Sequence, residues 1–315
     1  MGSKGVAMGS TVEALISVFG LIALGHILYR TGFAADGFWP TAEKLTYYLA
    51  LPALLVARLS EAPLHTLDLL PIVTVLVGAV LLVYLAQWLL LRPRTPKGGP
   101  AFTSVLQGSM RPNTYVGLAT AVALFGDEGL TLAAISLAVL VPLVNILAVI
   151  ALMRYGDQGD RAGAGMIGSI LRNPLVMACV VGILLNLLTP GLPGAAVLFL
   201  DGLGQAALPL GLMAVGAGLY WGEIGRNPGA LAVSSALKLL VLPLVTATAG
   251  WLMGLEETTL AVLVLFSAVP ASASCYILAR QLGGDAVLMA TILTVQTALA
   301  AITLPLVLWL TLWLF

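Results

Sequence analysis

The chain has 315 residues, of which 60% are hydrophobic and only 9% are charged, whereas soluble domains carry roughly 25% charged residues. This composition excludes a water-soluble globule, because so few polar side chains cannot cover the surface of a folded chain of this size. The 14 basic and 14 acidic residues cancel, and the scattered basic residues form no patch for nucleic acid. The sequence therefore predicts a protein that folds in lipid.

Apolar stretches of about 20 residues, the length of a helix that crosses a bilayer, follow one another along the chain. Proline, glycine and charged residues separate ten of them. Their predicted limits are 11–29, 40–58, 69–91, 100–126, 129–153, 167–188, 195–220, 228–254, 257–281 and 285–313. The unbroken apolar runs exclude an outer-membrane barrel, whose strands alternate apolar and polar residues. We expect an all-α polytopic membrane protein with ten transmembrane helices, the first of which is a retained span and not a signal peptide.

The two halves of the chain resemble each other after a shift of 157 or 158 residues, which aligns Pro52 with Pro209 and Pro112 with Pro270. Each half contains five spans. Because five is an odd number, the second half must enter the membrane with the opposite polarity, as in many secondary transporters. The predicted division is a first repeat at 1–153, a cytoplasmic linker at 154–166 and a second repeat at 167–315.

Basic residues in the loops predict the orientation, because cytoplasmic loops carry an excess of Lys and Arg. Two basic residues, Lys4 and Arg58, lie on one predicted side of the membrane. The nine on the other side are Arg30, Arg92, Arg94, Lys97, Arg154, Arg161, Arg172, Arg226 and Arg280. We assign the nine to the cytoplasm, which places both termini outside.

The fourth and ninth spans each contain a proline near the middle. Pro112 and Pro270 each remove a backbone N–H, and the polar groups that this frees in lipid must find partners in protein, water or ligand. Membrane-helix prolines often only kink a helix. Paired interruptions at equivalent points of two halves are nevertheless the best sequence pointer to a transporter's binding site, so we expect the site at these two breaks.

Arg111 makes the expected site suitable for an anion. The half-helix that begins after each break directs its positive dipole end toward the site. The carboxylates of spans four, five, nine and ten, Glu257 and Asp285, lie at span ends, so neither neutralises Arg111 near the midplane. The alternative role for Arg111 is to cap the carbonyls that end the first half-helix. The candidate solute-binding residues are Arg111, Pro112, Asn113, Thr114, Tyr115, Pro270, Ser272 and Ser274.

Lys238 and Asp201 are charged residues within predicted spans, and such residues are functional candidates by default. Both are candidates for ion or proton coupling. Lys238 has a structural alternative, because its side chain can pair with backbone carbonyls at a half-helix end. Asp201 lies near the start of the seventh span, where it can equally be interfacial, like the Glu43 and Lys44 pair.

Enzyme and metal-centre interpretations find no support in the motifs. The chain contains no G-x-S-x-G nucleophile elbow and no H-E-x-x-H word. Its two histidines, His26 and His65, and its two cysteines, Cys179 and Cys275, do not form a metal-binding pattern. We expect no enzyme and no resident cofactor.

Several words of the sequence resemble the auxin efflux carrier family over nearly the whole chain. They are Leu51-Pro52-Ala53-Leu54-Leu55, Pro112-Asn113-Thr114 with Gly117 and Leu124-Phe125-Gly126, Arg172-Asn173-Pro174, and Ala268-Val269-Pro270. The resemblance implies two inverted five-helix repeats with crossed, discontinuous helices four and nine. It also implies a scaffold of spans one, two, six and seven that forms a homodimer, and a mobile transport domain of the remaining spans. Asn113 matches the family's substrate-contacting asparagine.

The chain departs from the plant PIN-FORMED carriers at two points. Their long cytoplasmic loop is reduced here to a short linker, and Ala271 stands where they tend to have a glutamine. The second difference argues against auxin itself. Bacterial relatives are associated with small carboxylates, which agrees with the positive charge of Arg111.

Residues and resemblance together predict a secondary transporter of the plasma membrane, the bacterial inner membrane, that exports a small organic anion by elevator-type alternating access. The anion is a carboxylate or an auxin-like compound. A membrane potential contributes about 2.3 kcal/mol per charge per 100 mV, so efflux of an anion needs no coupling ion. The alternatives are a sodium-coupled organic anion symporter of the bile-acid type and a non-transporting receptor or scaffold. If the carrier uses a coupling ion, we expect sodium or a proton.

Overall fold

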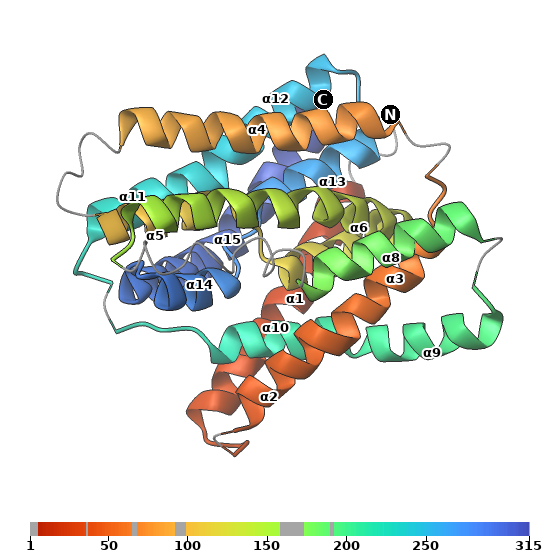
Figure 1. Cartoon of the computed structure of the whole chain (residues 1–315), viewed down its shortest axis with the longest axis horizontal. Coiled ribbons are helices and arrows are strands. Elements are labelled where there is room, and N and C mark those ends of the chain that lie inside the picture. Colours follow the sequence, from red (N-terminus) through yellow and green to blue (C-terminus); the bar gives the residue numbers. More distant parts are fainter. Residues whose placement is uncertain are drawn as a thin grey trace.

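The computed structural model describes residues 6–35, 37–64, 68–91, 99–157, 173–189, 192–222 and 224–314. Within these ranges the chain forms helices joined by short connections, with one isolated β-bridge between Pro112 and Ala271 (Figure 1). The prediction of an all-helical protein is confirmed for this part of the chain. Most of the linker at 154–166 lies outside the described residues, as do Lys4, His65, Arg92, Arg94, Lys97, Arg161 and Arg172.

The helices of the first half begin and end close to the predicted spans. They are α1 (Val6–Arg30), α2 (Phe38–Leu45), the π-helical turn η1 (Thr46–Ala50), α3 (Leu51–Glu61), α4 (Leu69–Leu90), α5 (Gly99–Met110) and α6 (Thr114–Tyr155). The helix α6 is divided at Gly126, whose φ of 59° and ψ of −141° leave the helical region. A glycine permits this turn because it has no Cβ to clash at positive φ.

The second half follows the same order. Its elements are α8 (Pro174–Leu188), α9 (Gly194–Gln205), α10 (Ala207–Ala217), α11 (Pro228–Ala236), the π-helical turn η5 (Leu237–Val241), α12 (Leu242–Leu252), α13 (Glu257–Ala268), α14 (Ser274–Leu282) and α15 (Ala286–Leu314). The predicted fourth and ninth spans are each two helices in the structure, with the break at the predicted proline.

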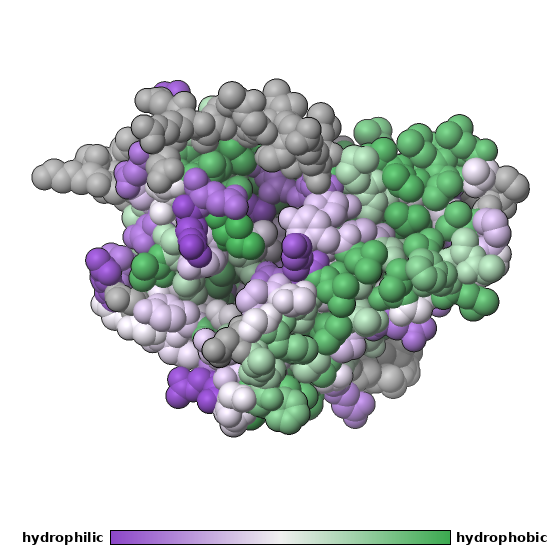
Figure 2. All heavy atoms as spheres, turned by 60° about the horizontal axis from the view of Figure 1, so that its bottom comes forward, coloured by the Kyte–Doolittle hydropathy of each residue, from purple (hydrophilic) through white to green (hydrophobic). Residues whose placement is uncertain are grey.

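Six of the described helical stretches are long and apolar enough to cross a membrane. They are Val12–Arg30, Leu69–Leu90, Thr114–Tyr155, Gly194–Ala217, Pro228–Leu252 and Ala286–Leu314. Figure 2 shows hydrophobic side chains over much of one end of the molecule and hydrophilic ones around a hollow beside it. Large apolar side chains of α8 and α9, such as Leu188 and Leu198 at 76% exposed, face outward, as expected of a membrane protein.

Helices α1 and α10 pack closely against each other. A Cβ added at Gly25 would lie 2.0 Å from the Met213 carbonyl oxygen, and one added at Gly216 would lie 1.8 Å from that of Ile22. The helix α3 packs along α8 and α9, whereas α13 packs against α6, α12 and α15. Figure 1 shows α4 and α12 running side by side. Pro112 and Pro270, at the two helix breaks, are buried.

Candidate solute-binding site

The two helix breaks meet in the interior of the protein. The backbone N–H of Asn113 donates to the Pro270 carbonyl oxygen at 2.8 Å, and Pro112 and Ala271 form the isolated antiparallel bridge. Four helix ends, those of α5, α6, α13 and α14, therefore converge on this contact. Short extended segments of this kind are tolerated at membrane depth only where protein or water satisfies their backbone groups.

Each proline deprives one carbonyl of its helical partner. In an α-helix the carbonyl of residue i accepts from the N–H of residue i+4, so Pro112 leaves Gly108 without a donor and Pro270 does the same to Phe266. Buried side chains from neighbouring helices replace these donors. Gln296 Nε2 donates to the Gly108 oxygen at 3.0 Å, and Lys238 Nζ donates to the Phe266 oxygen at 3.3 Å.

Gln296 connects the two breaks to each other. Its side chain is fully buried. Its Oε1 accepts a hydrogen bond from the backbone N–H of Ala271 at 2.9 Å, and its Nε2 donates to the Gly108 carbonyl oxygen. The same Nε2 also donates to Ser234 Oγ at 3.2 Å. The sequence prediction missed this residue. The available signal was a lone amide side chain within the apolar tenth span.

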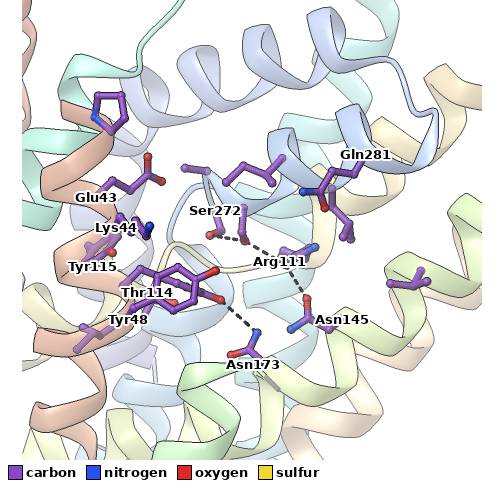
Figure 3. A pocket seen from close by; sticks show the side chains of 18 residues that line it. Glu43, Lys44, Tyr48, Arg111, Thr114, Tyr115, Asn145, Asn173, Ser272 and Gln281 are labelled. Carbon is purple, nitrogen blue, oxygen red and sulfur yellow. Dashed lines mark hydrogen bonds between the residues drawn. The ribbon is translucent and has the colours of Figure 1, made fainter. Parts of the chain in front are cut away.

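A cavity of about 390 Å³ lies beside the breaks, and Figure 3 shows its lining side chains. They come from α2, η1, α3, α6 and α14, from the N-cap of α8 and from the two breaks. The lining residues are Pro40, Glu43, Lys44, Tyr47, Tyr48, Leu51, Arg111, Thr114, Tyr115, Asn145, Val149, Asn173, Ser272, Ala273, Ser274, Ile277, Leu278 and Gln281. Such a mixture of apolar walls and convergent polar groups is typical of a small-molecule site.

Arg111 is the buried cation of this cavity. It is 6% exposed, and its Nη2 donates to Asn145 Oδ1 at 2.7 Å and to Ser274 Oγ at 3.0 Å (Figure 3). Its Nη1 donates to Gln107 Oε1 at 3.4 Å. All three acceptors are neutral, and the ion pairs among the described residues involve Arg58 instead. The guanidinium is thus held in place by hydrogen bonds, and no carboxylate of the described residues lies within ion-pair distance of it.

Tyr115 lines this cavity and also a second one of about 980 Å³. Its ring packs directly against Gly211 of α10, where an added Cβ would lie 2.1 Å from the ring. Its hydroxyl is buried and makes no hydrogen bond to any described residue. Because buried hydroxyls are normally paired, this orphan group is a further candidate donor to a bound solute.

The structure brings together most of the residues that the sequence predicts for the site. Arg111, Thr114, Tyr115, Ser272 and Ser274 line the first cavity, and Asn113 lines the second. Pro112 and Pro270 line neither cavity and shape the breaks instead. The alternative in which Arg111 caps backbone carbonyls differs from the structure, where its guanidinium bonds to side-chain oxygens.

Asn113 has a different local role from the one expected. Its Oδ1 accepts the backbone N–H groups of Tyr115 at 3.1 Å and Val116 at 3.2 Å, so it is the N-cap of α6. The sequence predicts that the N–H groups of this helix end face an anion. In the structure, two of these N–H groups donate to the Asn113 side chain and not to an anion. Such capping is favourable because a buried N–H without a partner is costly.

Several cavity residues escaped the sequence prediction. Glu43 and Lys44 were expected to be interfacial, yet both line the first cavity. The physical reason is that η1 and α3 continue α2 along the cavity wall, so Glu43 is half-buried there while Lys44 stays exposed at the same cavity. Asn173 caps α8 through Oδ1 and donates from Nδ2 to the Tyr47 hydroxyl at 3.1 Å (Figure 3).

The two charged coupling candidates lie in different places. Lys238 is fully buried beside the end of α13. Asp201 lines neither described cavity, and its carboxylate lies 3.6 Å from Arg58 Nη2. Arg58 Nη1 also lies 3.2 Å from Asp127 Oδ1, at the turn that divides α6. No group of three metal-ligating side chains occurs among the described residues.

Comparison with known proteins indicates a membrane transporter. Residues 165–308 match the model of a family described as membrane transport protein. The chain is also 25% identical over 306 residues to an uncharacterized transporter of Methanothermobacter thermautotrophicus, and the match covers 96% of this chain and 98% of the relative. The resemblance to a membrane transporter family is confirmed. This match agrees with the resemblance to auxin efflux carriers that the motifs around the two breaks indicate. A transporter family is also consistent with the expectation that the chain is no enzyme.

Proposed function

We propose that this membrane transport protein is a secondary carrier of a small organic anion, and that the cavity beside Arg111 is its solute site. The observation that carries the proposal is that Arg111 is buried and that no carboxylate of the described residues lies within ion-pair distance of it. Burial of an unpaired charge costs several kcal/mol, so an arginine held only by neutral oxygens favours a site that an anion completes. The hydroxyl of Tyr115 and the oxygens of Ser272 and Ser274 would add directional hydrogen bonds.

The cavity volume favours a small solute. About 390 Å³ is at the lower end of the range of ligand pockets, roughly 300–1,000 Å³. The lining includes one acidic side chain, Glu43, and two basic ones, Lys44 and Arg111, so the cavity has a net positive lining. A carboxylate fits both properties, and a guanidinium presents two parallel N–H donors to such a group.

The proposed architecture is two inverted five-helix repeats, with helices four and nine discontinuous and crossed at Pro112 and Pro270. The paired breaks and the contact between Asn113 and Pro270 support this arrangement. The packing of α1 with α10 and of α3 with α8 and α9 supports a separate scaffold of spans one, two, six and seven. We propose that the remaining helices carry the solute across in an elevator movement, and that the scaffold's apolar outer face meets lipid and a second copy of the chain.

We propose that the carrier lies in the plasma membrane. We also propose that its conformation in this structure is open to the cytoplasm. Arg30 and Arg280 line the second cavity and Lys44 lines the first, and the distribution of basic residues assigns this end of the molecule to the cytoplasm. The opposite end carries the ion pairs of Arg58 with Asp127 and Asp201. An inside-negative potential would then drive efflux of the anion without a coupling ion.

Flux measurements in proteoliposomes test the proposal. The purified protein is reconstituted, a potassium diffusion potential is imposed, and uptake of a panel of radiolabelled mono- and dicarboxylates is followed with and without sodium or proton gradients. We expect potential-driven uptake of at least one anion. The substitution Arg111→Gln should reduce that uptake about 10- to 100-fold, because a hydrogen bond to a charged group contributes about 1.5–3 kcal/mol and 1.4 kcal/mol is a factor of ten.

Two matched variants control for loss of charge and loss of fold. Arg111→Lys keeps a positive charge and should retain part of the flux. Arg280→Gln removes an exposed cation that lines the second cavity and should leave flux nearly unchanged. The proposal would be contradicted if the wild type took up none of the anions, or if the flux of Arg111→Gln equalled that of the wild type. A strict sodium requirement would favour the sodium-coupled alternative.

A further inference from the structure

Lys238 is a fully buried cation for which the proposed solute site has no use. It lies in the π-helical turn η5 between α11 and α12, and short π-helical segments occur frequently at functional sites. Its hydrogen bond is the one from Nζ to the Phe266 carbonyl oxygen at 3.3 Å. Within the described ranges, no carboxylate lies within ion-pair distance of it.

The need for a hydrogen-bond donor does not explain the charge of Lys238. Gly108 and Phe266 are 158 residues apart, each four residues before the proline of its break, and each loses its helical donor in the same way. At Gly108 the neutral amide of Gln296 supplies the donor. Since an amide suffices there, burial of an ammonium beside Phe266 adds a large desolvation cost that satisfaction of the carbonyl alone does not require.

The surroundings of Lys238 are those of a cation site. The Phe266 carbonyl is in the last turn of α13 (Glu257–Ala268), where the helix dipole places a partial negative charge. Neutral oxygens lie close by in sequence: Ser235 Oγ is buried and unpartnered, and Ser267 Oγ pairs with Thr246 Oγ1 at 2.7 Å. In carriers with broken helices, carbonyls at half-helix ends of this kind coordinate the coupling cation.

We propose that Lys238 is a tethered cation that occupies the position of a coupling metal ion at the end of α13. The inference rests on the proposed anion carrier and adds to it the reason why transport needs no sodium. The ammonium donates to the carbonyl that a sodium ion would use as a ligand, and it supplies a positive charge without a bound ion. The carrier then moves its anion in response to the potential alone.

Replacement of Lys238 by a small neutral residue tests the proposal. Lys238→Ala removes the ammonium and opens space beside the Phe266 carbonyl, which a small monovalent cation can enter. Anion flux is compared in sodium, potassium, ammonium and N-methyl-D-glucamine chloride, the last cation being too large to enter. Wild-type flux should be equal in all four salts. Flux of Lys238→Ala should be low in N-methyl-D-glucamine and rise about 5- to 10-fold in at least one small cation, a typical coupling between two sites.

Lys238→Gln separates the charge from the hydrogen bond. It can donate an amide to Phe266 as Gln296 does to Gly108, but it carries no charge, so a folded Lys238→Gln should show reduced flux in every salt. Wild-type flux in Lys238→Gln, or a folded Lys238→Ala that no cation restores, overturns the inference. If Lys238→Ala does not fold, Lys238→Gln and the salt dependence of the wild type decide. A wild type that requires sodium also refutes the tethered cation, whereas a wild type without anion flux refutes the proposed function itself.

Discussion

Gln296→Leu should destabilise the protein by about 2–6 kcal/mol, because it removes the partner of two buried backbone groups at once. The Gly108 carbonyl loses its donor and the Ala271 N–H loses its acceptor. Each unsatisfied buried group costs about 1–3 kcal/mol. Leucine has nearly the volume of glutamine, so the cavity contribution stays small. Ser234 adds little, since its hydroxyl still donates to the Val105 carbonyl oxygen.

The assay is unfolding in mixed micelles by titration with sodium dodecyl sulfate, followed through the fluorescence of the 6 tryptophans. Thr297→Val is the matched control, because Thr297 is buried in the same helix and its hydroxyl donates only to the Leu293 carbonyl one turn earlier. We expect the control to cost about 0–1 kcal/mol. Gln296→Glu, which keeps an acceptor for Ala271, should lie between the two. A Gln296→Leu variant as stable as the control would show that Gln296 does not hold the breaks together.

Two further substitutions test local features of the fold. Asn113→Ala removes the cap of α6 and should lower the free energy of unfolding by about 0.5–2 kcal/mol in the same assay. Asn113→Asp keeps an acceptor and should recover most of that stability. Equal stability of the two variants would contradict the capping role. Gly216→Ala forces α1 and α10 apart, because its Cβ would lie 1.8 Å from the Ile22 carbonyl oxygen, and should cost about 1–3 kcal/mol. Gly20→Ala, with open space at the Cβ position, should be neutral, and a Gly216→Ala variant as stable as this control would refute close contact of the two helices.

The positions of the helix breaks could be predicted from the sequence because they depend on local chemistry. Proline lacks an N–H wherever it lies, so Pro112 and Pro270 end a helix irrespective of their neighbours, and α5 and α13 do end two residues before them. Arg111 could be predicted as a site residue for a related reason. It is adjacent to a break, and a charge in the middle of an apolar span must find a polar environment.

The remaining cavity residues could not be predicted because they come from spans whose sequence does not reveal which side faces the breaks. Asn145 and Gln296 lie in long apolar helices, and a helix that is apolar all round gives no periodic signal for its buried face. Glu43 lies near the end of a span, where charged residues are ordinary. Only the packing of that helix against the breaks distinguishes it from an interfacial residue.

The two halves of the chain satisfy the same backbone requirement with different side chains, and this difference has a functional consequence. In the first half the cation is on the break itself, at Arg111, and a neutral amide serves the freed carbonyl. The residue 158 positions later is Val269, and there the cation comes from the neighbouring span, as Lys238. The two halves therefore have equivalent helix ends, but their buried cations lie at positions that are not equivalent. With the roles proposed for Arg111 and Lys238, such an arrangement allows the solute and the coupling cation to change by substitution of side chains, because the backbone that both depend on is held by hydrogen bonds that need no particular charge.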